Sequence, residues 1–205
     1  MALVLHFIFG FSSSFVGMLT PSMLNMTTVK ITLERGKMNA IKFAFGVSTV
    51  VLIQAYAAVF FTKFLKENPN YILILQKFAL VILALLSLYF YREFKKANKI
   101  SVDFKQKCRD TFVVGLFLSA INMFAIPFYY GITTFLNKIG LMQLSQNNIL
   151  LFVIGSGIGT FILLYSYTHF GKYMQSKTNG SSNKLNLVLS ILTGVLTMVT
   201  FIKLF

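Results

Sequence analysis

Six apolar runs constrain what this chain can fold into more than any other feature. They cover approximately residues 2–28, 40–62, 71–91, 112–136, 148–170 and 185–205. A helix needs roughly 20 residues to cross the hydrocarbon core of a bilayer, and each run is long enough. Because 56% of the residues are hydrophobic and only 12% are charged, the apolar surface exceeds what a globular protein of this size can bury. The sequence predicts an all-α integral membrane protein with six transmembrane helices and the lipid bilayer as a partner.

The connections between the runs indicate a single transmembrane domain over residues 1–205. Polar loops are expected at 29–39, 92–111 and 171–184, with turns near 66–70 and 137–147, and none has the character of a domain linker. Most of the 19 lysines and arginines lie in the three loops or at the adjoining helix ends. Short cytoplasmic loops carry such an excess of cations, so both termini are predicted outside. Cations that lie in short clusters between apolar runs do not predict a nucleic-acid partner.

A proline interrupts the first run about one membrane leaflet in. Thr20 is a good N-cap residue, and proline is best tolerated at the first helical position, so a new half-helix is expected to begin at Pro21. Non-helical backbone persists at membrane depth only where protein buries it or where it lines a watery cavity. The N-terminus of a half-helix facing such a cavity is suited to an anionic group. Polar residues follow this proline, namely Ser22, Asn25, Thr27 and Thr28.

The two halves of the chain repeat one another. Pro127 interrupts the fourth run as Pro21 interrupts the first, and the same polar pair follows each proline at the same distance, Thr27-Thr28 and Thr133-Thr134. A glycine is likewise followed ten residues later by a tyrosine in each half, Gly46 with Tyr56 and Gly155 with Tyr165. With three spans per half, the second half must begin on the opposite side of the membrane. The sequence thus predicts two inverted three-helix repeats, about 1–91 and 112–205, with broken first and fourth helices that meet near the midplane.

The residues around these prolines resemble the lysine-exporter (LysE-type) family of bacterial inner-membrane amino-acid exporters. That family carries Pro-Gly-Pro in its first span and glycines at three fixed distances after the first proline; the matching positions here are Pro21-Ser22-Met23, Gly36, Ala40 and Gly46. The Asn-Pro-Lys element of its fourth span looks like Ile126-Pro127-Phe128 here. The resemblance implies a divergent member. It would be a multi-pass secondary transporter of the bacterial inner (plasma) membrane, exporting an amino acid or a similar small zwitterionic solute by alternating access.

An amino-acid solute asks for donors around its carboxylate and acceptors around its ammonium group. The free N–H groups at a half-helix N-terminus suit the carboxylate. Side-chain oxygens near the breaks and a tyrosine face suit the ammonium group. The predicted substrate-binding residues are Pro21, Ser22, Asn25, Thr27, Thr28, Gln54, Asn122, Pro127, Tyr130, Thr133 and Thr134.

Other function classes find less support. All five acidic residues lie in predicted loops or at helix ends, so neither a metal site nor a catalytic carboxylate pair is expected, and no cofactor. The single Cys108 excludes a redox carrier that needs two thiols. A non-transporting membrane scaffold or subunit remains the alternative, in which the prolines only kink helices.

Two further features keep more than one interpretation. His6 and His169 could carry a coupling proton, although placement at the two membrane interfaces is the favoured reading. Gly155, Gly157 and Gly159 indicate close helix packing, either within the chain or between subunits of a homo-oligomer.

Overall fold

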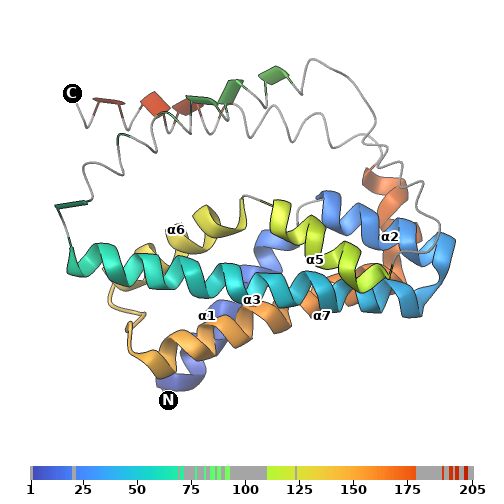
Figure 1. The fold of residues 1–205 in the computed structure, drawn as a ribbon, viewed down its shortest axis with the longest axis horizontal. Helices are drawn as coiled ribbons and strands as arrows, with labels where there is room; N and C mark the ends of the chain where they lie inside the picture. The colour runs from blue at the N-terminus through green and yellow to red at the C-terminus, as the bar shows by residue number, and fades with distance from the viewer. Residues whose placement is uncertain are drawn as a thin grey trace. The chain divides into compact units, whose positions relative to one another are not determined.

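The computed structural model describes residues 2–19, 22–68, 110–122 and 124–178 continuously. It also describes single residues farther along, namely 70, 71, 77, 81, 84, 85, 87, 88, 91, 92, 191, 194, 195, 197, 198, 201 and 202. The labelled helices are α1 (Ala2–Leu19), α2 (Met23–Arg35), α3 (Lys37–Glu67), α5 (Thr111–Ile121), α6 (Ala125–Lys138) and α7 (Gln146–Thr178) (Figure 1). The described part of the chain contains no strand, as the apolar runs predict.

Two of these helices are long and apolar enough to cross a membrane, namely α3 and the Gln146–His169 part of α7. The predicted first and fourth spans each consist of two helices. α1 and α2 are bent by 75° at their break, and α5 and α6 by 62°. If each bent pair is one span, the described residues hold up to 4 spans. Most of the predicted third and sixth runs, 71–91 and 185–205, lies outside the described residues, and the residues described there are helical.

The loop predicted at 29–39 is almost entirely helical, which corrects that expectation. α2 continues to Arg35 and α3 begins at Lys37, because lysine, glutamate and arginine are good helix formers and their charge alone does not end a helix. Only Gly36 interrupts the two helices. Its φ of 85° lies in the region that favours glycine, and its N–H donates to the carbonyl of Thr32. A reversal of direction is thus made at one residue.

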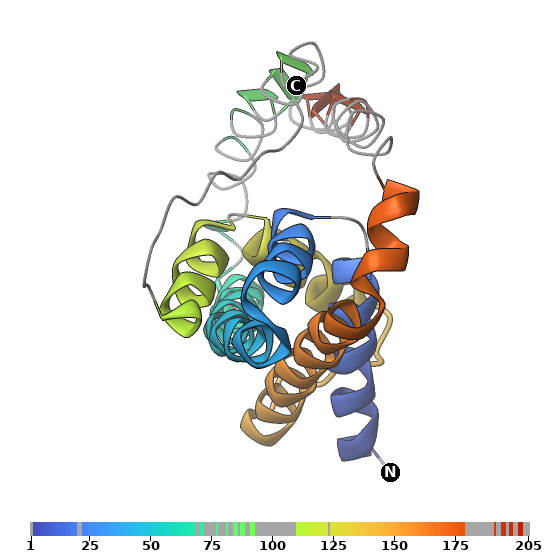
Figure 2. The ribbon, with the colours of Figure 1, turned by 90° about the vertical axis from the view of Figure 1, so that its right-hand side faces the viewer.

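Contacts divide the chain into two compact units, one of residues 1–64 with 102–176 and the other of residues 65–101 with 177–205. The first unit contains the breaks. Its buried core includes Leu24, Phe43, Phe152 and Leu164. Within it α1 packs against α6 and α2 packs against α5. The view along the helices shows α5 beside α3 and α1 beside α7 (Figure 2).

Glycines bring the helices of this unit into backbone contact. A Cβ atom at Gly10 or Gly155 would overlap a carbonyl oxygen across the α1–α7 contact, and one at Gly46 or Gly115 would do so across the α3–α5 contact. Small residues allow such close approach between membrane helices. The packing role predicted for Gly155 is confirmed, and Gly159 meets Phe11 of α1 in the same way, whereas Gly157 faces the side chain of Leu52.

Candidate functional site

The first break lies just before α2. Thr20 and Pro21 are outside the described residues, but the helix itself begins at Met23. Its N-cap is Ser22, whose hydroxyl accepts a hydrogen bond from the N–H of Asn25 at 3.4 Å. The expectation that Thr20 caps a helix starting at Pro21 is therefore wrong. Ser22 has the extended backbone that an N-cap requires, and its short side chain reaches back to the first turn.

Side chains satisfy the carbonyl groups that this bend leaves at the end of α1. The fully buried Asn25 donates from Nδ2 to the carbonyl of Met18 at 2.6 Å. From α7, the hydroxyl of Tyr167 donates to the carbonyl of Leu19 at 3.4 Å and also interacts with the side chain of Asn25. Helix ends away from water need such partners. Asn25 and Tyr167 therefore hold the first bend in place.

Gln54 of α3 has the corresponding role at the second break. Its Nε2 donates to the carbonyl of Ser119 at 3.0 Å and to that of Asn122 at 3.4 Å, where α5 ends. The side chain is buried, with 7% of its surface exposed. Its Oε1 has no hydrogen-bond partner among the described residues. A buried carbonyl oxygen without a partner is energetically unfavourable, so this atom is a candidate acceptor for a ligand.

Pro127 is the third residue of α6, not its first as predicted. α6 begins at Ala125, and its N-cap Phe124 makes no side-chain capping hydrogen bond. Proline is tolerated at this position because N–H groups of the first helical turn have no partner within the helix. The irregular backbone therefore lies around residues 122–124, and Pro127 itself is exposed.

The paired threonines differ in their surroundings despite their matching positions in the sequence. Thr27, Thr28 and Thr133 are buried, whereas Thr134 is exposed. The three buried hydroxyls donate to carbonyls four residues earlier in their own helices. Thr133 also pairs with the hydroxyl of Thr62 on α3 at 2.8 Å. These hydroxyls are engaged locally, so they can offer a solute acceptor positions more readily than donors.

The sequence did not identify the buried tyrosines. Tyr130 is half-buried against Phe61, with ring centroids 5.9 Å apart, and the repeated Tyr165 is exposed. The buried tyrosines are instead Tyr129, which precedes Tyr130, and Tyr167, which lies two residues after Tyr165. The Tyr129 hydroxyl interacts with hydroxyls of α1 and α7 that sequence reasoning also missed, Ser14, Ser156 and Thr160. The sequence signal that could have identified these residues is the presence of serine and threonine inside apolar runs.

The two histidines have different environments. His6 is 2% exposed, and its Nε2 accepts a hydrogen bond from the N–H of Gln143 at 3.1 Å. His6 is thus buried against the segment between α6 and α7, and its placement at the membrane interface stays a prediction. His169 is exposed on α7 beside the ring of Tyr165, with centroids 4.7 Å apart. Among the described residues, no three His, Cys, Asp or Glu side chains lie close enough to hold a metal ion.

The beginning of α6 lies against the end of α1. A Cβ atom at Gly17 would come within 2.6 Å of the Phe128 ring, so this ring covers the last turn before the first break. Tyr129, next along α6, packs edge-on against Phe152 of α7, with centroids 6.3 Å apart. α1, from the first bent pair, therefore contacts α6, from the second bent pair.

Removing the Asn25 amide is expected to destabilise the first bend. In Asn25→Ala the carbonyl of Met18 loses its donor at a buried position, which costs about 1 to 3 kcal/mol. We expect a lower thermal midpoint of the detergent-purified protein, with membrane insertion retained. Thr49→Ala is the control, because Thr49 is exposed and its hydroxyl donates to the carbonyl of Phe45 in the same helix. Equal midpoints for the two variants would contradict the role given to Asn25.

Comparison with known proteins gives one match. The family described as LysE type translocator matches residues 15–204, nearly the whole chain. No curated protein and no solved structure shows significant similarity to the chain.

Proposed function

Since this chain belongs to the LysE type translocator family, and is thus a membrane transporter of amino acids or similar solutes, we propose that it exports a small zwitterionic solute by alternating access. Members of this family are transporters, not enzymes. The solute is an amino acid or a close chemical relative. Transport crosses the bacterial inner membrane from the cytoplasm, and both termini lie outside.

The proposed architecture is six spans in one domain, arranged as two inverted repeats. Exchange of contacts between the halves supports it. α1 of the first half packs on α6 of the second, and α5 of the second half packs on α2 of the first. The close glycine contacts follow the same pattern. Gly10 of α1, in the first half, contacts α7 of the second half, and Gly115 of α5, in the second half, contacts α3 of the first half. A two-fold relation between the halves would produce both exchanges.

The observation that carries this proposal is the arrangement of Gln54 at the second break. Its amide N–H groups are used to hold the carbonyls of Ser119 and Asn122, and its buried Oε1 lacks a partner among the described residues. A solute ammonium group would supply the missing donor. Asn122 and Tyr130 lie at or just beyond the same break, and both are half-buried, so they complete the proposed ammonium side.

The proposed carboxylate side is the N-terminus of α2. The helix dipole and the first N–H groups there favour an anion by about 0.3 to 2 kcal/mol before side chains contribute. Ser22 is half-buried at this terminus, and Asn25, Thr27 and Thr28 line the following turn. On α6 Pro127 has no N–H and the N–H of Ala125 donates to the carbonyl of Asn122, which makes α2 the better of the two helix starts. We assign Pro127, Thr133 and Thr134 of α6 to the wall of the route that the solute takes between the two breaks.

An efflux assay tests the proposed function. The purified protein is placed in liposomes loaded with an equimolar mixture of the twenty amino acids, and release is followed by chromatography with and without a pH gradient. We expect selective release of one or a few amino acids above the rate of protein-free liposomes. Release of none under either condition would refute amino-acid export. A difference between the two conditions would identify proton coupling.

A further inference from the structure

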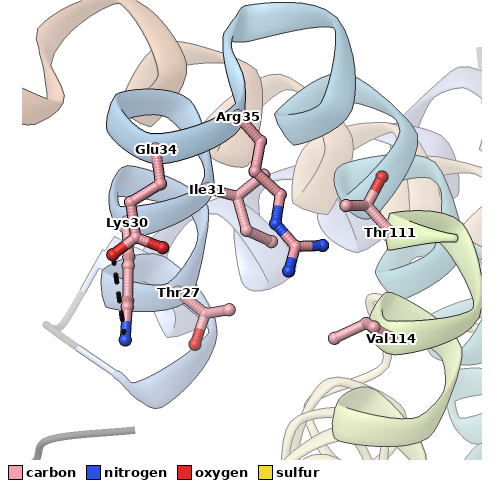
Figure 3. Close-up of a pocket in the computed structure, with 7 residues that line it drawn as sticks. All are labelled: Thr27, Lys30, Ile31, Glu34, Arg35, Thr111 and Val114. Carbon is pink, nitrogen blue, oxygen red and sulfur yellow. Dashed lines mark ion pairs between the residues drawn. The ribbon is translucent and has the colours of Figure 1, made fainter. Parts of the chain in front are cut away.

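A small pocket lies between α2 and α5, apart from the two breaks. It is lined by Thr27, Lys30, Ile31, Glu34 and Arg35 of α2 and by Thr111 and Val114 of α5 (Figure 3). Its cavity volume of about 30 Å³ has room for roughly two water molecules. A pocket of this size can admit one charged group of a solute without rearrangement.

The pocket is lined by charges of both signs. Lys30 and Glu34 form an ion pair at 4.0 Å on one side of α2. The Arg35 guanidinium lies on the other side, between the two helices, and faces Val114 (Figure 3). Thr111, at the start of α5, is 4% exposed, and its hydroxyl has no hydrogen-bond partner among the described residues. Arg35 can bind a carboxylate, and Glu34 can attract an ammonium group.

The pocket extends from the charged end of α2 toward the first break. Arg35 is eight residues beyond Thr27, which corresponds to about 12 Å along a helix. Thr27 is itself in the turn that follows the capped start of α2. Arg35 and the proposed carboxylate site therefore lie at the two ends of one helix, α2. In the proposed orientation the Arg35 end faces the cytoplasm.

Side-chain hydrogen bonds hold the opposite end of the unit together. Thr133, which matches Thr27 in the repeat, is fully buried and pairs with Thr62. The segment between α6 and α7 is fastened to α1 through the N–H of Gln143 and His6, and to α6 through Asn137, whose Nδ2 donates to the carbonyl of Met142 at 2.7 Å. Thr27, which is also buried, lines the charged pocket at the α2–α5 end.

We infer that the pocket between α2 and α5 is the cytoplasmic loading site, where Arg35 binds the carboxylate of a zwitterionic solute before it reaches the breaks. This inference rests on the proposed function and orientation. Arg35 then captures the solute through its carboxylate. Glu34 exchanges its ion pair with Lys30 for one with the solute ammonium group.

Chemical labelling tests the charge of the pocket without requiring transport. Val114→Cys is made in a Cys108→Ser background and treated from the cytoplasmic side with methanethiosulfonate reagents, one anionic (ethylsulfonate) and one cationic (ethyltrimethylammonium). We expect the anionic reagent to react faster. The ratio of the two rates should fall about three- to ten-fold when Arg35→Gln is added, because a nearby charge is removed from a partly buried site. An unchanged ratio would overturn the inference.

Two matched variants separate local charge from general effects. Lys37→Gln removes an exposed cation two residues away that does not line the pocket, and the ratio should stay unchanged. Arg35→Lys keeps the charge and should keep most of the ratio. An equimolar mixture of the twenty amino acids should slow labelling of Val114→Cys, and choline chloride at the same concentration should not. Equal protection by both, or none by the mixture, would also overturn the loading site.

The efflux assay distinguishes failure of this inference from failure of the proposed function. For Arg35→Gln we expect the amino-acid concentration giving half-maximal efflux to rise about five-fold or more, with a maximal rate close to that of the unmodified protein. If the unmodified protein releases amino acids and Arg35→Gln has the same half-maximal concentration, the loading site is refuted while transport stands. If the unmodified protein releases none, transport is refuted and the labelling ratio still reports on the pocket.

Discussion

Gln54→Leu is expected to reduce amino-acid efflux about a hundred-fold or more, with the protein still inserted in the membrane. The substitution removes the side-chain donors to the carbonyls of Ser119 and Asn122, which keep the backbone N–H groups of Asn122 and Ala125 as donors, and each lost hydrogen bond costs about 0.5 to 1.5 kcal/mol. It also removes the Oε1 acceptor proposed for the ammonium group. Leucine has a similar volume, so the loss reflects hydrogen bonding rather than a cavity. The measurement is initial efflux rate per inserted protein.

Thr49→Leu provides the matched control for Gln54→Leu. It introduces the same residue five positions earlier on α3, where the side chain is exposed and its hydroxyl donates to the carbonyl of Phe45. Efflux should remain within about two-fold of the unmodified protein, as for most exposed substitutions. Normal efflux in Gln54→Leu would show that this side chain neither maintains the second break nor contacts the solute.

Gly46→Ala is expected to cause a large loss of stability for the addition of a single carbon atom. The new Cβ would overlap the carbonyl oxygen of Phe112 and approach the N–H of Leu116, both backbone groups of α5. Backbone cannot rotate away as a side chain can, so α3 and α5 must separate. Overpacking of this kind costs about 1 to 3 kcal/mol or more. We expect a markedly lower thermal midpoint in detergent, and poor recovery of folded protein for the larger Gly46→Val.

Gly131→Ala is the comparison for Gly46→Ala. Gly131 is also helical, in α6, but a Cβ atom there would meet nothing within 4 Å. Alanine has a higher helix propensity than glycine by about 1 kcal/mol, so this variant should be as stable as the unmodified protein or slightly more so. Similar midpoints for the two alanine variants would mean that α3 and α5 are not in backbone contact at Gly46.

The sequence alone determined the class of the protein and the places where its helices break. Apolar runs of about 20 residues require helices in a membrane, because a bilayer leaves backbone groups no other partners. Pro21 and Pro127 indicated breaks in the first and fourth runs, and a bent pair of helices lies at each. The family resemblance followed from residues near the prolines, and the family match covers residues 15–204. Gly46 and Gly155 were identified by a local pattern, and both lie at backbone contacts between helices.

Only the tertiary structure decided which polar groups meet. Gln54 binds carbonyls 65 and 68 residues away, and no local pattern specifies such a pair. The sequence also did not show which face of each helix is buried in the protein. Lipid and protein interior are both apolar, so hydrophobic periodicity does not distinguish them. For that reason Thr134 was grouped with Thr133, and the burial of Tyr167 and His6 was missed. Helix boundaries also depended on capping geometry, which placed the start of α2 after Ser22, beyond the predicted proline. Local sequence thus determined where helices form and break, and long-range packing determined which side chains meet at the breaks.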